Sequence, residues 1–318
     1  MHNLWRKIIF SFLVIFPMTT MAAENYAGKK ILFIDSYHAG FEWSDGIAQG
    51  VRGVLEKTAV ELKVVHMDTK RNASEAFIKS AALKVKAVIE EFKPDVVIAS
   101  DDNACKYLIV PYYKNTDLPV VFCAVNWDAA VYGFPCKNVT GMVEVALIPE
   151  IIKNLKKYAK GNSIGFIAAD RLSAKKEYQY HREILNIDYA QAYFAKNYQE
   201  WKRMFLKLQD EVDMAIMLNH VGITDWNDRQ AQTFVENHTK IPMGARNGWD
   251  MSFSLIGVVN IPDEQGTWAT HAALKILEGV PPSKIPLTRN KQGKLFFNLR
   301  IGKKLGITTP PPFATISD

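Results

Sequence analysis

Cysteine is scarce in this sequence, because only Cys105, Cys123 and Cys136 occur among 318 residues. So few cysteines exclude a small scaffold held together by disulfides, and their spacing matches no zinc-binding pattern. An odd number of cysteines leaves two interpretations open for an oxidising compartment. Either Cys123 and Cys136 form a disulfide beside one buried thiol, or all three are small buried apolar side chains.

Runs of one charge are also missing. The formal net charge is +6, and the lysines are spread along the chain rather than clustered. A nucleic-acid-binding protein is expected to carry a continuous basic stripe, so no nucleic-acid partner is predicted. Charged residues make up 23% of the sequence, which is close to the globular average and argues against wholesale disorder.

The common catalytic and cofactor-binding motifs are absent, including G-x-G-x-x-G, the P-loop and H-E-x-x-H. Residues 161–165 match G-x-S-x-G, but Ser163 precedes a predicted strand, whereas a nucleophile elbow places its serine between a strand and a helix. We therefore expect a protein that is not an enzyme and that uses no cofactor. No metal site is expected either, because the spacing of the candidate ligands carries no metal-binding signature. These candidates are Asp35, His38, Asp101, Asp102 and His220.

Long hydrophobic runs are absent after the N-terminal segment. Residues 1–23 combine a positively charged head, an apolar run and small residues before a cleavage point, which is typical of a secretory signal peptide. The apolar run is about half of the roughly twenty residues that a membrane-spanning helix needs. No cysteine lies at the cleavage point, so no lipid anchor is indicated, and we expect an exported protein.

What the sequence does contain is a repeated alternation of apolar runs and amphipathic segments. The first unit is residues 31–54, where the run Ile31–Ile34 ends in a polar and aromatic loop, and helical spacing begins at Ser44. Further units follow to about residue 143, and a second series begins at Leu147. The pattern predicts the α/β class, with two Rossmann-like lobes of parallel strands joined by a hinge near 143–147.

Several stretches carry a resemblance to a known family. They are PVVFCAVNWDAA, KNVTGMVE, SIGFIAAD, LEGVPPSKIP and KLFFNLRIGKKLGITTPPPF. In order and spacing they resemble the ABC-transporter substrate-binding protein family that includes tryptophan- and tyrosine-binding members. The resemblance implies the type I periplasmic binding protein fold, with lobe 1 at 28–142 plus 259–285 and lobe 2 at 143–258 plus 286–318.

The resemblance also implies a function. It is that of a periplasmic solute-binding protein, which captures a small polar or aromatic, amino-acid-like ligand between its lobes and delivers it to the permease of an ABC transporter. The loop DSYHAGFEW looks more like that of periplasmic sensing domains. The alternative is therefore a ligand sensor that signals to a membrane histidine kinase or diguanylate cyclase. An exported enzyme is a third alternative, and a monomer is expected.

The candidate ligand-binding residues are polar and aromatic side chains that follow predicted strands, where parallel sheets bind their ligands. In lobe 1, the first loop offers rings for stacking, and Asp101 offers a carboxylate for an ammonium or hydroxyl group. In lobe 2, Arg171 and Arg246 are suited to clamp a carboxylate or phosphate. The alternatives are that the rings pack on their own lobe, that the acids cap a helix and that the arginines form surface ion pairs. The full set is Tyr37, His38, Trp43, Ser100, Asp101, Asn126, Trp127, Asp170, Arg171, Asn219, Arg246 and Trp249.

Overall fold

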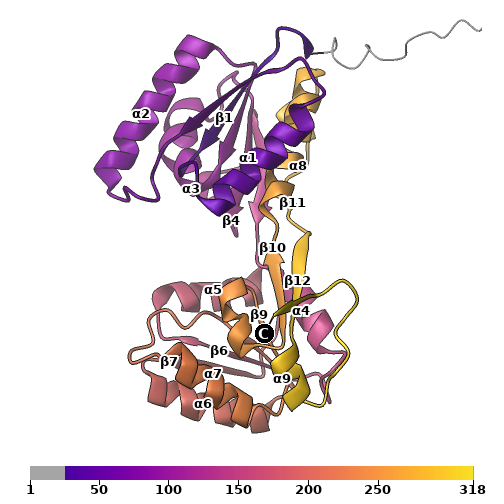
Figure 1. Ribbon diagram of the computed structural model, residues 1–318. Coiled ribbons are helices and arrows are strands. Elements are labelled where there is room, and N and C mark those ends of the chain that lie inside the picture. The colour runs from indigo at the N-terminus through magenta and orange to yellow at the C-terminus, as the bar shows by residue number, and fades with distance from the viewer. Residues whose placement is uncertain (1–25, 318) are drawn as a thin grey trace, which may run out of the picture.

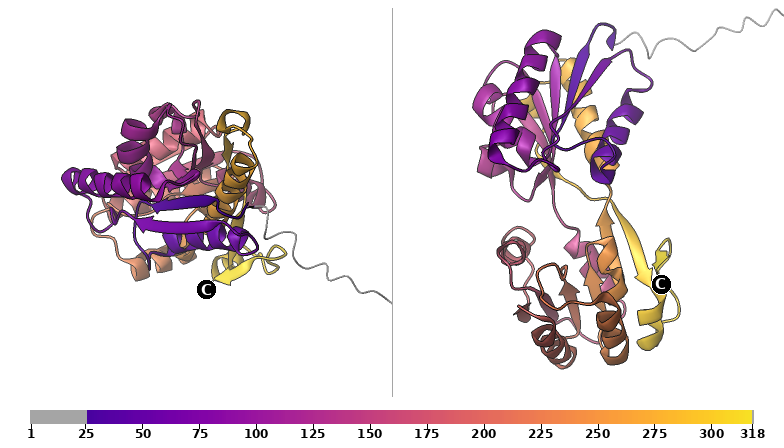
Figure 2. Two further views of the ribbon diagram at one scale, coloured as in Figure 1. Left: turned by 90° about the horizontal axis from the view of Figure 1, so that it is seen from above. Right: turned by 60° about the vertical axis from the view of Figure 1, so that its left-hand side comes forward.

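The computed structural model describes residues 26–317 and consists of two α/β lobes stacked end to end (Figures 1 and 2). Each lobe is built on its own β-sheet, with helices packed against it. The predicted fold class, two Rossmann-like lobes of mainly parallel strands, is confirmed. The predicted signal peptide, residues 1–23, lies outside the described residues.

The first lobe contains a six-stranded sheet in which every pair of neighbouring strands is parallel. Across the sheet the strands are β11 (Thr288–Arg289), β5 (Val139–Glu144), β4 (Val120–Asn126), β3 (Val96–Ser100), β1 (Lys30–Asp35) and β2 (Glu61–His66). The central strands β1 and β3 are almost entirely buried because helices cover both faces of the sheet. One face packs against α1 (Glu42–Leu55) and α8 (Pro262–Leu277), and the other packs against α2 (Glu75–Phe92) and the π-helix η2 (Cys105–Tyr113).

The second lobe contains a seven-stranded sheet, in which β12 runs antiparallel to β10 and the other pairs are parallel. In order the strands are β13 (Thr315–Ser317), β12 (Gly293–Asn298), β10 (Ile256–Asn260), β9 (Met243–Ala245), β8 (Met214–Met217), β6 (Ile164–Ala169) and β7 (Gln191–Ala195). Its α-helices are α4 (Ile148–Leu155), α5 (Leu172–Glu183), α6 (Tyr198–Glu211), α7 (Asp228–His238) and α9 (Leu299–Lys304). The short helices of the chain are α3 (Asp101–Ala104), η3 (Ala129–Tyr132), η4 (Gly248–Phe253) and η5 (Pro282–Lys284).

The chain passes between the two sheets three times, at residues 145–147, 261 and 290–292. The side chain of Asn290 accepts a hydrogen bond from the Val145 amide at 2.7 Å, and Asn260 Nδ2 donates to the Val145 carbonyl at 3.1 Å. These bonds join the crossings to one another. Relative to the division expected from the sequence, the first sheet extends further, to Glu144 and again to Arg289, and the second sheet keeps all of β10.

Helices α1 and α8 pack so closely that glycine is required at their crossing. A Cβ atom on Gly50 would lie 2.3 Å from the Asp263 carbonyl oxygen, and one on Gly266 would lie 2.0 Å from the Ile47 carbonyl oxygen. Backbone therefore meets backbone at this contact. Because α1 follows the first loop of lobe 1 and α8 begins just after the crossing at residue 261, the contact fixes that loop relative to that crossing.

The cysteines decide one of the open alternatives. All three are free, so the interpretation with a Cys123–Cys136 disulfide is wrong. Cys123 lies inside the core that α1 and α8 form with the sheet, because its strand, β4, is buried on both faces. Cys105 is buried in the core on the other face, and Cys136 is half-buried.

None of the helices in the described part of the chain combines the length and apolar character that a membrane-spanning helix requires.

Candidate functional site

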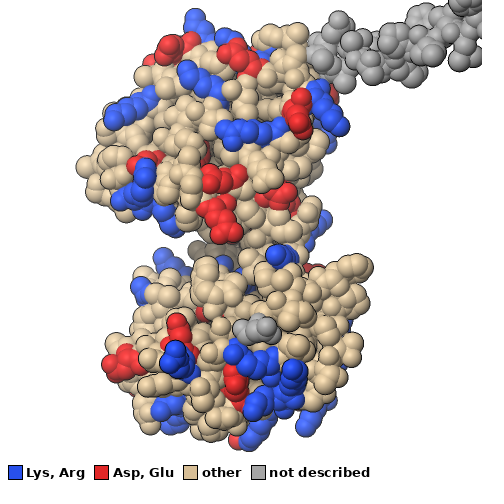
Figure 3. All heavy atoms as spheres, viewed as in Figure 1, with Lys and Arg blue, Asp and Glu red and all other residues tan. Residues whose placement is uncertain are grey.

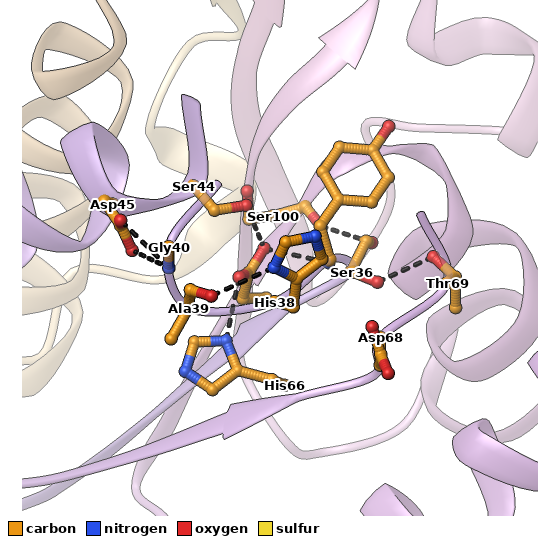
Figure 4. A network of polar contacts seen from close by, with 12 residues as sticks. Ser36, His38, Ala39, Gly40, Ser44, Asp45, His66, Asp68, Thr69 and Ser100 are labelled. Atoms are coloured by element: carbon orange, nitrogen blue, oxygen red, sulfur yellow. Dashed lines mark hydrogen bonds and ion pairs between the residues drawn. The ribbon is translucent and has the colours of Figure 1, made fainter. Parts of the chain in front are cut away.

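Asp35 ends β1, and its buried carboxylate organises the first loop of lobe 1, whose polar contacts are drawn in Figure 4. Its Oδ1 accepts hydrogen bonds from Ser44 Oγ at 2.9 Å and from the Tyr37 amide at 3.0 Å. Its Oδ2 lies 2.9 Å from Nδ1 of His66. Asp35 thereby ties the loop to α1 and to β2, so its role is to hold the loop that precedes Trp43.

Ser36 locks the first loop to its neighbours. Its hydroxyl donates to the Ser100 carbonyl at 2.6 Å and accepts from the Ala104 amide at 2.8 Å. Its carbonyl accepts from Thr69 Oγ1 at 2.6 Å (Figure 4). The loops that follow β1, β2 and β3 are thus joined by buried hydrogen bonds, and this edge of lobe 1 is preorganised.

Three residues just beyond the carboxyl ends of lobe 1 strands have a positive φ, which non-glycine residues seldom adopt. They are Asp68 (56°) after β2, Asp101 (74°) after β3 and Trp127 (62°) after β4. For a side chain as bulky as tryptophan such a conformation is strained, and strain of this kind gathers at ligand clamps and active sites. The carboxyl edge of the first sheet therefore has the local geometry of a functional site.

Asp101 is a buried acid at this edge, with a side chain only 4% exposed. Burial, followed by the negative charge of Asp102, raises the pKa of Asp101 to about 8. The Tyr37 hydroxyl contacts Asp101, and burial together with this carboxyl raises the pKa of the phenol. Asp102 accepts hydrogen bonds from the Tyr132 hydroxyl and from Asn126 Nδ2, both at 2.7 Å.

Glu144, the last residue of β5, brings a third acid to the same edge. Desolvation raises its pKa to about 7, and the negative charges of Asp102 and Glu177 act in the same direction. Asn260 Nδ2, at 3.2 Å from Oε1, and the positive charge of Arg246 oppose that rise. On the face seen in Figure 3, acidic side chains gather along the edge of the first lobe that faces the second. A cationic group is the natural complement to this edge.

Arg246, just after β9, is the basic group that lobe 2 contributes. Its Nε lies 2.6 Å from Oε1 of Glu177 on α5, and His181 Nε2 lies 3.7 Å from the same oxygen. Within the described chain, neither the Arg246 Nε nor that Glu177 oxygen meets the geometry of a hydrogen bond, so the contact is an ion pair. The guanidinium carries five N–H donors, so this pair leaves others for an anionic ligand group.

A cavity of about 340 Å³ lies between the lobes and contains residues from both of them. It is lined by Phe41, Glu42, Trp43, Glu144, Ala146, Arg246, Asn247, Gly248, Trp249, Val259, Asn260 and Pro262. A larger hollow of about 710 Å³ lies beside α5, lined by residues 175–188. That hollow contains none of the strand-end residues described above, so the cavity between the lobes is the better candidate.

Trp127 makes an aromatic contact across the lobes. Its ring stacks on Tyr180 of α5, with centroids 5.3 Å apart and planes at 25°. It also lies 5.6 Å from the buried imidazole of His181, whose pKa is lowered by burial. The Trp127 amide donates to the Glu144 carbonyl at 2.8 Å. Trp127 therefore joins the acidic edge of lobe 1 to the helix that holds the partner of Arg246.

Part of the predicted ligand-binding set is brought together. Trp43, Arg246 and Trp249 line one cavity, although Trp43 and Trp249 are more than two hundred residues apart in the sequence. Tyr37 and Asp101 lie near it and feel the charge of the cavity residue Glu144, which contributes to raising the pKa of each of them. These residues retain the predicted role in ligand binding as a proposal.

The other predicted residues of lobe 2 lie outside the cavity. Asp170 forms an ion pair with Lys175. Arg171 Nη1 donates to the Val221 carbonyl at 3.0 Å, and Asn219 Oδ1 accepts from the Val221 amide at 3.1 Å. These contacts are local to the rim of lobe 2, and none of the three side chains lines the cavity.

The remaining predicted residues of lobe 1 have internal partners. Nδ1 of His38 lies 2.9 Å from the Ala39 carbonyl oxygen, and Ser100 is buried against the Ser36 network. Asn126 is exposed and bonded to Asp102, as described above. Trp127 was predicted as a ligand-binding residue at a strand end, and in this structure its ring stacks on Tyr180 of the protein itself.

Sequence reasoning missed Glu144 and Asn260 as cavity residues. Glu144 had the same signal as the residues that were found, because it directly follows the apolar run of a predicted strand. Asn260 had no such signal, since it lies where the chain leaves the second sheet. Phe41 was part of the predicted loop but was not singled out.

Metal binding gains no structural basis. Within residues 26–317, no group of three or more His, Cys, Asp or Glu side chains is arranged to hold a metal ion. Two of the candidate ligands are divided between the lobes, because Asp35 ends β1 whereas His220 follows β8.

The sequence profile described as ABC transporter substrate binding protein matches residues 41–315. No curated protein sequence matches the chain. The ligand-free, open structure of a substrate-binding protein with adhesive properties from Clostridium difficile is similar, with a TM-score of 0.69 at 18% identity, covering 91% of this chain and 99% of that one.

Two further solved structures share the fold. An ABC domain from Streptococcus pneumonia in complex with L-Trp has a TM-score of 0.54 at 18% identity, covering 91% of this chain and 99% of its own. A periplasmic ribose ABC transporter protein from Conexibacter woesei has a TM-score of 0.52 at 13% identity, covering 88% and 96%. The profile spans most of the sequence, and the two-lobed architecture agrees with it. The chain therefore belongs to the ABC transporter substrate-binding protein family and has the type I periplasmic binding protein fold.

Proposed function

We propose that this substrate-binding protein captures an amino-acid-like ligand in the cavity between its lobes. The observation that carries the proposal is the division of charge across that cavity. Lobe 1 supplies Glu144, with Asp101 and Asp102 close by, and lobe 2 supplies Arg246. A ligand with an ammonium group and a carboxylate group satisfies both sides at once, whereas a neutral sugar satisfies neither charge.

The apolar part of the ligand has its own surface in the cavity. Phe41 and Trp43 come from lobe 1, and Trp249, which is 66% exposed, comes from lobe 2. Aromatic walls with a few converging polar groups are typical of small-molecule sites. A similar fold binds L-Trp in the Streptococcus pneumonia structure, which supports an aromatic or apolar amino acid as the first ligand class to test.

Binding would act by closure of the lobes. A ligand that contacts both lobes binds the closed arrangement more tightly than the open one, and so shifts the population toward closure. We propose that an exported, monomeric protein in the periplasm presents this closed form to the permease of an ABC transporter, and that the ligand is released without chemical change.

The first loop favours a second candidate function, that of a periplasmic sensor whose closed form is read by a membrane histidine kinase or diguanylate cyclase. The sequence DSYHAGFEW forms a loop held rigidly by Asp35 and Ser36. Both functions use the same cavity and differ in the membrane partner. Uptake of the ligand by cells that lack this gene distinguishes them, since only the transport function predicts that uptake is lost.

A thermal-shift screen tests the ligand class. Protein without residues 1–23 is heated with each of the L-amino acids, with D-ribose and with adenine. One or more amino acids are expected to raise the melting temperature saturably, because a ligand at 100 times its Kd stabilises the folded state by about 2.7 kcal/mol. Chromatography of the ligand afterwards is expected to show no turnover. Stabilisation by ribose alone would overturn the amino-acid assignment, and consumption of the ligand would overturn a pure binding function.

Arg246→Gln is expected to weaken binding of the ligand found in that screen by at least about 30-fold, because removing one partner of a desolvated charge pair costs about 2 kcal/mol or more. Calorimetric titration measures the change. Arg203→Gln, on the exposed side of α6, is the matched control and should bind as the unmodified protein does. Equal affinity in both variants would show that Arg246 serves Glu177 rather than the ligand.

A further inference from the structure

His220 lies behind the cavity rather than in it. It follows β8 in the loop that leads to α7 and faces the short helix η4. That helix and the two residues before it, Arg246 and Asn247, form the segment 246–253, which we call the cleft turn. Arg246, Asn247, Gly248 and Trp249 of the cleft turn all line the cavity.

The carboxylate of Asp250 is the buried end of the cleft turn, with no exposed surface. Its Oδ2 accepts a hydrogen bond from Asn247 Nδ2 at 2.9 Å. Its Oδ1 lies 3.6 Å from Nδ1 of His220, and among the described residues neither of these two atoms makes a hydrogen bond. A buried acid without a partner is costly, and the imidazole of His220 is the side chain that faces this oxygen.

The surroundings of His220 fix the position of its ring. Nε2 lies 3.6 Å from the exposed carboxylate of Asp228, so each ring nitrogen faces one acid. The ring is stacked on Trp226, with centroids 4.6 Å apart and planes at 8°, and the edge of Phe253 completes the site. Trp226 Nε1 in turn donates to Asp228 at 2.7 Å. The loop between β8 and α7 and the cleft turn are therefore joined through the imidazole of His220.

We propose that His220 is a positioning residue of the ligand cavity: by pairing with Asp250 it holds the cleft turn in the arrangement that presents Asn247 and Trp249 to the ligand. Asp250 directly follows Trp249, and its amide donates to the Asn247 carbonyl at 3.2 Å, so a displacement of Asp250 displaces both cavity residues. The inference rests on the proposed function in one respect, because it takes this cavity to be the ligand site.

Amide hydrogen exchange of the ligand-free protein tests the pairing directly. In His220→Gln, exchange of the amides in residues 247–253 is expected to accelerate at least tenfold, while residues 30–35 of β1 keep their rates. Asp250→Asn in the same background removes the unpaired charge and is expected to restore most of the protection. His271→Gln, on the exposed side of α8 in the other lobe, is the matched control and should leave the cleft turn unchanged.

Two outcomes would overturn the proposal. One is unchanged exchange of the cleft turn in His220→Gln. The other is an acceleration that spreads through the whole of lobe 2 and that Asp250→Asn fails to reverse, which would show a general packing role. Because exchange is measured without ligand, an unsuccessful ligand screen and a failure of this proposal are separate results.

Discussion

Gly266→Ala is expected to lower the free energy of unfolding by about 3 kcal/mol, because the new methyl group has no space between two helix backbones. Its Cβ would lie 2.0 Å from the Ile47 carbonyl oxygen, and α1 and α8 would have to move apart to admit it. Overpacking of a rigid core costs about 1 to 3 kcal/mol, and the cost lies at the upper end where the obstacle is backbone rather than a flexible side chain. Urea denaturation followed by circular dichroism measures the loss.

Gly53→Ala is the matched control on the same helix pair. Gly53 lies in α1, but a Cβ there would meet no atom within 4 Å. Alanine is the better helix former, so this variant is expected to be more stable by up to about 1 kcal/mol. If both variants were equally stable, the contact between α1 and α8 would not be the close backbone contact that fixes the first loop of lobe 1.

Asp101→Asn is expected to remove most of a pH dependence from the stability of the protein. The folded protein raises the pKa of Asp101 from 3.8 to about 8, so the folded state holds a proton that the unfolded chain releases. Its contribution to stability is fully present near pH 4 and is lost as the pH rises through about 8. The shift corresponds to an upper bound of roughly 6 kcal/mol, and the charges of neighbouring acids contribute part of it.

Melting temperatures measured between pH 4 and pH 9 test this expectation. Asparagine is uncharged throughout and tolerates the positive φ of this position, so the variant should show a much shallower decline. Glu144, whose pKa is raised to about 7, accounts for the remaining decline. Asp117→Asn, at an exposed position of the same lobe, should decline as the unmodified protein does. A decline of equal steepness in the Asp101 variant would show that this carboxyl is not the source.

The same reasoning gives the pH dependence of ligand binding a sign. An ammonium group pairs with the ionised form of Asp101 or Glu144, so binding an amino acid near pH 7 expels a proton from the cavity. Affinity for such a ligand is therefore expected to increase from pH 5 to pH 8, in the opposite direction to the stability of the ligand-free protein.

Hydrophobic periodicity predicted the elements of both lobes because each buried strand and each amphipathic helix carries its signal locally. Val96–Ala99 and Ile164–Ala168 are continuous apolar runs that predict strands, and they form β3 and β6. Nothing local marks the order of strands in a sheet. The return of the chain to the first lobe at α8 followed from the family resemblance, and the antiparallel direction of β12 was not predicted at all.

The site was partly predictable because the ends of the strands are marked locally in the sequence. The rule that ligands lie beyond the carboxyl ends of parallel strands selected Arg246 and Trp249, which line the cavity, and Asp101, which lies near it. Their role in ligand binding stays a prediction. The rule also selected Arg171 and Asn219, because it gives the edge but not the direction in which a side chain points. That direction depends on partners distant in sequence, such as Glu177 for Arg246.

The three crossings between the lobes restrict how the molecule can move. A single connecting segment would allow the lobes to swivel about its axis. Three segments joined through Asn290 and Asn260 are expected to resist torsion and to leave bending as the softer motion. Opening is then expected to proceed mainly by bending. On the proposed function, a membrane partner that senses the separation of two points, one on each lobe, could read from that single distance whether the cavity is occupied.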